Sequence, residues 1–123
     1  AQSILLPASV SSDARADYLE ALKCYYDGCY RASAVMIRRF LEEVLAEKGF
    51  NDNSSLKSEI DKANKEGLLN DYMTQIAHGI RFLGNWGAHP NDDNLKDVTA
   101  DDVEIALLLI KKLASSALMS GVS

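Results

Sequence analysis

The chain has 123 residues, 47% of them hydrophobic, and its 13 basic and 18 acidic side chains give a net charge of −5 at pH 7. This length suits one domain with a single core over residues 1–123 and excludes two domains, while the negative charge excludes an extended surface for nucleic acid. No apolar run reaches the roughly 18 residues of a membrane span and no signal-peptide pattern opens the chain, so we expect a soluble, cytoplasmic protein without a membrane partner. The first residue is Ala1 rather than Met, so this domain is compatible with excision from a longer protein.

Apolar residues recur at three- and four-residue spacing along most of the chain, and both prolines, Pro7 and Pro90, lie outside these periodic segments. This pattern predicts an all-α fold of about five helices. The first helix is expected to begin at Ser12, as its N-cap, and to end at Gly28. The second is expected over residues 30–48, forming a hairpin with the first across a very short turn.

The third and fourth helices follow a polar loop at residues 51–55. The third is predicted to end at Gly67, and the fourth to begin near Asn70. Pro90 disfavours helical backbone at the preceding residue, so the fourth helix is expected to end near Gly87.

The fifth helix is predicted over about residues 100–119, with Thr99 as N-cap and Asp102 completing a capping box. Its segment 105–110 is entirely apolar. A helix that is apolar on nearly all sides is either central in a bundle or half of an oligomer interface. Together with an exposed region around Trp86, this pattern predicts a homodimer.

The two cysteines, Cys24 and Cys29, are five residues apart, which fits neither a zinc knuckle nor a redox pair. We therefore expect reduced, buried, structural thiols.

The fourth helix carries a polar stripe at spacings of three and four, made of His78, Arg81, Asn85 and His89. Two histidines alone do not make a metal site, and no cofactor motif is present, so we expect no metal and no cofactor. No carboxylate stands at a helpful spacing from His78, which predicts a solvated surface residue. His89 either closes the helix through Asn85 or acts as an acid or base.

Arginines of the second helix offer a possible anion site next to that stripe. Arg38 and Arg39 each precede a glutamate by four residues, which predicts two ordinary surface ion pairs. The alternative is that one of these arginines faces the fourth helix and binds an anion there.

The fourth helix also contains a glycine, Gly84, and the only tryptophan of the chain, Trp86. Glycine in such a position commonly lets another backbone approach closely, and tryptophan more often anchors a core or interface than it stacks on a base. Gly84 and Trp86 are therefore candidate interface residues.

Three segments together resemble the HEPN superfamily of small helical bundles, and more narrowly the domain of unknown function 4145 (DUF4145) family. They are YLEALKCYYDGCYRA at residues 18–32, MIRRFLE at 36–42 and IRFLGNWGAH at 80–89. The resemblance implies an up-and-down helical bundle, found alone or fused to restriction and antiphage proteins.

Superfamily members that cleave RNA carry an arginine followed, about four to six residues later, by a histidine, and two such motifs meet across a dimer without metal. His89 matches the motif histidine and Asn85 a polar residue that often follows the arginine. Gly84 stands where the motif arginine is expected, and Arg81 lies one turn too early.

From this resemblance we expect a non-catalytic or degenerate HEPN-like module for dimerisation and interaction, in a prokaryotic defence or restriction-associated system, with a protein partner or a fused domain. RNA is disfavoured as a partner. The alternative is a metal-independent endoribonuclease that uses His89 as acid or base with Arg81, and with Arg38 or Arg39 as a phosphate clamp. A second alternative is a nucleotide-binding partner of a nucleotidyltransferase.

Overall fold

The computed structural model describes residues 6–51, 55–88 and 98–120, and for residues 86–88 and 120 it describes the backbone alone. Within these ranges every regular element is a helix, so the predicted all-α class is confirmed. The helices are α1 (Ser12–Tyr26), α2 (Tyr30–Glu47), α3 (Leu56–Lys65), α4 (Asp71–Ala88), α5 (Ala100–Leu113) and α6 (Ala117–Ser120).

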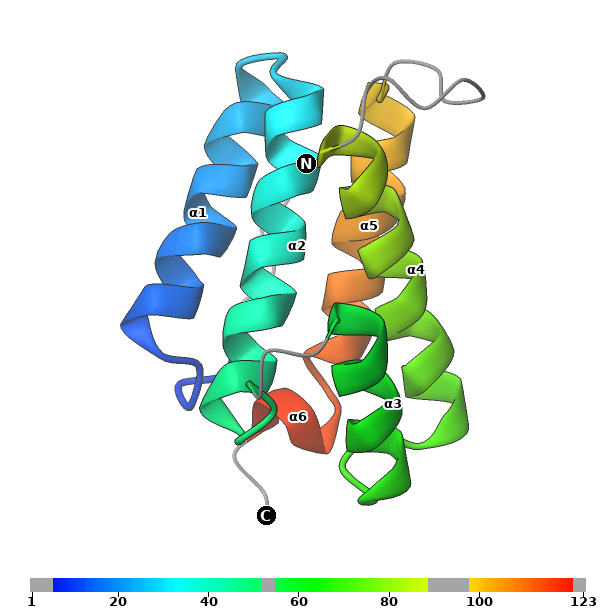
Figure 1. Ribbon diagram of the computed structural model, residues 1–123. Coiled ribbons are helices and arrows are strands. Elements are labelled where there is room, and N and C mark those ends of the chain that lie inside the picture. Colours follow the sequence, from blue (N-terminus) through cyan, green and yellow to red (C-terminus); the bar gives the residue numbers. More distant parts are fainter. Residues whose placement is uncertain (1–5, 52–54, 89–97, 121–123) are drawn as a thin grey trace.

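The four long helices lie side by side, with α3 and α6 at one end of the bundle (Figure 1). α2 is central, because it packs against α1, α4 and α5. α4 packs in addition against α3 and α5. None of the helices within the described ranges is long and apolar enough to cross a membrane.

The core is built mainly on one face of α2, where Ile37, Phe40 and Leu41 are fully buried. Ile80 of α4 and Ile110 of α5 complete this layer, also without exposed surface. The amphipathic spacing seen in the sequence therefore buries the faces that it predicts.

The helix ends follow local signals, with one shift at the first residue. Ser11, rather than the predicted Ser12, is the N-cap of α1, and its hydroxyl accepts a hydrogen bond from the Ala14 amide at 3.1 Å. After α1, Gly28 adopts φ +81°, a left-handed conformation that side chains disfavour, so α2 begins only two residues later. At α5 the predicted capping box of Thr99 and Asp102 is confirmed.

The prediction of one last helix over 100–119 is wrong, because the helix ends at Leu113 and α6 begins at Ala117. Two serines explain the break. The hydroxyl of Ser115 donates to the Lys112 carbonyl at 2.8 Å and that of Ser116 to the Leu113 carbonyl at 2.6 Å. These local bonds compete with continuation of the helix.

The prediction that both cysteines are buried is also wrong. Both thiols are free, but Cys24 is only half-buried and Cys29 is exposed, immediately before α2. Burial is the main cause that raises the pKa of the Cys24 thiol. Cys29 is exposed because it lies in the tight α1–α2 turn instead of on a helix face.

Candidate functional site

The predicted site lies on α4, whose start is fixed by its neighbour in the chain. The side-chain oxygen of Asn70 accepts a hydrogen bond from the Met73 amide at 2.8 Å, so Asn70 caps α4. α4 then runs to Ala88, one residue past the predicted end near Gly87. Of the predicted site residues, His89 and the side chain of Trp86 lie outside the described residues.

Gly84 marks a close contact between α4 and α2. A Cβ atom at Gly84 would stand 2.4 Å from Cβ of Arg38, a distance that real side chains do not tolerate, and 3.1 Å from the Ala34 carbonyl oxygen, which is also tight. The expectation that Gly84 lets another backbone approach is therefore confirmed. The approaching helix is α2 of the same chain.

This contact brings Arg38 of α2 against Gly84 of α4, next in sequence to the stripe residue Asn85. The anion-binding role of Arg38 or Arg39 stays a prediction. The guanidinium of Arg38 lies 3.5 Å from the Glu42 carboxylate, as its four-residue spacing predicts. Its Nε is buried and has no hydrogen-bond partner among the described residues.

The second predicted pair, Arg39 with Glu43, is not formed. Arg39 is exposed, and Glu43 instead lies beside Glu47. Burial and the neighbouring Glu47 raise the pKa of the Glu43 carboxyl. Arg39 does not join the α2–α4 contact, because it is one residue further around the helix than Arg38.

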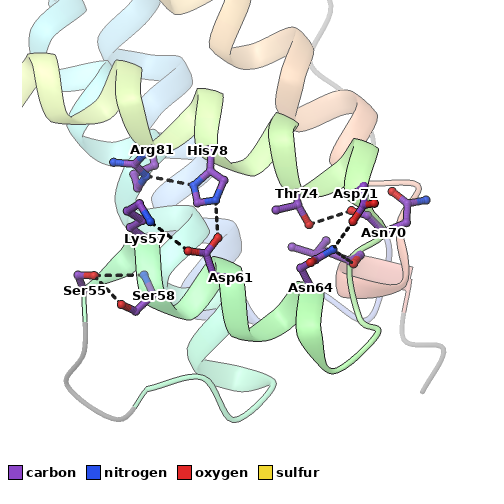
Figure 2. Close-up of polar contacts among 11 residues, drawn as sticks. Ser55, Lys57, Ser58, Asp61, Asn64, Asn70, Asp71, Thr74, His78 and Arg81 are labelled. Carbon is purple, nitrogen blue, oxygen red and sulfur yellow. Dashed lines mark hydrogen bonds and ion pairs between the residues drawn. The ribbon is translucent and has the colours of Figure 1, made fainter.

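A polar chain of four side chains connects α3 to α4 (Figure 2). Lys57 Nζ donates to Asp61 Oδ2 at 3.2 Å, and the other oxygen of that carboxylate lies 2.8 Å from Nε2 of His78. Arg81 Nε donates to His78 Nδ1 at 3.3 Å. The prediction of a solvated His78 is therefore wrong, and its side chain is only 19% exposed.

The two hydrogen bonds of His78 fit one tautomer of a neutral ring. In that tautomer Nδ1 accepts from Arg81, and Nε2 carries the proton and donates it to Asp61. The hydrogen bonds from His78 and Lys57 lower the pKa of the Asp61 carboxyl. With both ring nitrogens engaged, His78 positions α3 on α4 and is not free for general acid or base chemistry.

The contact between Asp61 and His78 joins two helices, so residue spacing along one helix does not predict it. Asp61 lies four residues before the last residue of α3 and His78 seven residues after the first residue of α4. Helices joined by a short turn run antiparallel, so residues on the two sides of the turn can face one another. His78 has no carboxylate three or four residues away on its own helix, and Asp61 of the preceding helix supplies one.

The structure thus brings together Arg38 and Gly84 from two helices, with Asn85 half-buried next to Gly84 and Arg81 one turn earlier. In residues 6–51, 55–88 and 98–120, no three His, Cys, Asp or Glu side chains are grouped to hold a metal ion. A shallow hollow of about 320 Å³ lies elsewhere, where the α1–α2 turn meets Val98.

Residues 19–117 match the family described as a domain of unknown function (DUF4145), and the chain belongs to that family. Neither the curated proteins nor the solved structures include a match to the chain.

Proposed function

We propose that this chain is a HEPN-like module for homodimerisation and protein interaction, with a degenerate ribonuclease site, in a prokaryotic defence or restriction-associated system. The contact of Gly84 with Arg38 carries the proposal. An arginine at position 84 would need space for its first side-chain carbon at 2.4 Å from Cβ of Arg38. The bundle therefore packs in a way that excludes the motif arginine from its expected place.

Surface composition supports an interaction role. Ile105 and Leu108 of α5 are 51% and 60% exposed, and Phe82 of α4 is 51% exposed. Large apolar side chains that remain in contact with water favour association with another surface. The single described histidine, His78, is meanwhile engaged at both ring nitrogens.

Light scattering tests the dimer directly, with a mass of about twice 13.5 kDa expected. A monomeric mass at tens of micromolar would contradict homodimerisation. For the degenerate site, single-stranded RNA is incubated with the protein in excess chelator at low salt, which favours binding. We expect no cleavage.

The ribonuclease remains a second candidate because of one observation. Arg38 lies beside Gly84, so it could supply a cation from α2 close to the position where the motif arginine is expected. Products ending in 2′,3′-cyclic phosphate would favour this alternative, provided that Arg38→Ala and His89→Ala abolish them. Lys48→Ala, at the far end of α2, is the matched control that should retain them.

A further inference from the structure

The outer face of α5 carries four exposed side chains in one stripe. Asp101, Ile105, Leu108 and Lys112 follow each other at spacings of four, three and four, which places them along one line of a helix. Ile105 is 51% and Leu108 60% exposed. The opposite face of α5, with Val103, Ala106, Ile110 and Leu113, is buried in the core.

This α5 stripe is complementary to itself when a second copy runs antiparallel. Asp101 then faces Lys112 of the second copy and Ile105 faces Leu108, and the two-fold axis repeats both pairings. Such a surface meets the requirement of an isologous interface, in which the same patch contacts itself. A parallel arrangement would instead bring Asp101 against Asp101.

The charges at the ends of the α5 stripe are available for this pairing. Neither Asp101 nor Lys112 forms an ion pair with another described residue of the chain, and neither has a charged residue four positions away on α5. An acidic first turn and a basic last turn also suit the helix dipole. The dipole gives no reason, however, for the two large apolar residues exposed between them.

Another exposed apolar surface lacks this arrangement. On α1, Leu19 is 57% and Tyr26 58% exposed. The charges next to them already pair within the chain, since Lys23 Nζ lies 3.7 Å from Asp27 Oδ2. This α1 surface therefore offers a partner little charge complementarity.

The α5 stripe extends toward α4. A Cβ at Gly79 would lie 3.1 Å from Leu109 Cδ1, which fixes how the two helices are aligned. α4 and α5 run in opposite directions (Figure 1), so Phe82, one turn after Gly79, lies at the level of Ile105. A standard interface buries about 800 Å² on each subunit, and the exposed Phe82 would add apolar area to the α5 stripe.

We infer that the α5 stripe is the homodimer interface, formed by antiparallel packing of α5 against α5 of a second copy. This inference rests on the proposed homodimerisation and adds its surface and symmetry. Apolar contacts at the centre stabilise the pair, while the ion pairs at the ends select the antiparallel orientation.

Two charge variants test the orientation. Asp101→Lys places lysine against Lys112 twice, and Lys112→Asp places aspartate against Asp101 twice, so each variant alone should dissociate at least tenfold more readily than the wild type. A mixture of the two should form heterodimers, because all end charges are then opposite. Native mass spectrometry resolves the species. Lys111→Asp, on the neighbouring side of α5, is the control and should leave the homodimer intact.

Two matched substitutions of exposed leucines test the apolar centre of the α5 stripe. Leu108→Glu should yield monomers, whereas Leu19→Glu, at a site of similar exposure on α1, should leave dimers. Circular dichroism spectra must be unchanged for either result to count. Dimers that survive Leu108→Glu and both charge variants would overturn the α5 interface and leave homodimerisation standing. A monomeric wild type would overturn both.

Discussion

The contact between Gly84 and Arg38 gives a quantitative prediction for Gly84→Ala. In a helix, alanine is favoured over glycine by about 1 kcal/mol. Here the new Cβ would stand 2.4 Å from Cβ of Arg38 and 3.1 Å from the backbone oxygen of Ala34. Neither atom is the end of a flexible side chain, so α2 and α4 must move apart.

Overpacking of this kind costs about 1–3 kcal/mol, which outweighs the gain in helix propensity. After the gain of about 1 kcal/mol is subtracted, we expect Gly84→Ala to lower the free energy of unfolding by up to about 2 kcal/mol, or the melting temperature by up to about 10 °C. Thermal and urea unfolding measure the change.

Gly79→Ala is the matched control on the same helix. Its Cβ would lie 3.1 Å from Leu109 Cδ1, the end of a flexible side chain that can turn aside. We therefore expect Gly79→Ala to be neutral or to stabilise by up to about 1 kcal/mol.

A double-mutant cycle identifies the colliding atom. Arg38→Ala keeps its Cβ and should not relieve Gly84→Ala, whereas Arg38→Gly should reduce the cost of that substitution. If Gly84→Ala stabilises the protein as much as Gly79→Ala does, α2 and α4 do not approach each other in this way and the reasoning is refuted.

Three further predictions concern titratable side chains. The hydrogen bonds from His78 and Lys57 lower the pKa of Asp61 below its usual 3.8, so their contribution to stability is present above that value and is lost as the pH falls through the lower, folded pKa. The melting temperatures of wild type and Asp61→Asn should therefore differ near neutral pH and converge in acid, and a difference independent of pH would contradict this role. Tyr25 donates a hydrogen bond to Glu104 at 2.6 Å, which raises its pKa to about 12. This contribution is complete below the ordinary pKa of 10.0 and is lost as the pH rises through about 12, so Tyr25→Phe should remove a step near pH 12 from the ultraviolet tyrosine titration; persistence of that step would assign it elsewhere. Exposed Cys29 should react with a thiol reagent such as dithionitrobenzoate before Cys24, whose pKa is raised mainly by burial. Cys29→Ser should remove the fast phase, and retention of that phase would reverse the assignment.

The helices of this protein follow from short-range features of its sequence. Ser55 and Thr99 accept hydrogen bonds from the first turns of their helices, and Gly28 takes the left-handed conformation that ends α1. Each feature acts within a few residues, so its effect does not depend on the rest of the fold. The buried face of α2 follows in the same way from the spacing of its apolar residues.

The candidate site depends on which helices become neighbours, and spacing along one helix does not determine this. The sequence marks Gly84 as a place of close approach, but only the packing of α4 on α2 selects Arg38 as the residue that fills it. His78 has no carboxylate three or four residues away on its own helix, and the α3–α4 hairpin supplies Asp61 from 17 residues away. Contacts of this kind are made between elements, so their partners are decided when the helices pack and not when they form.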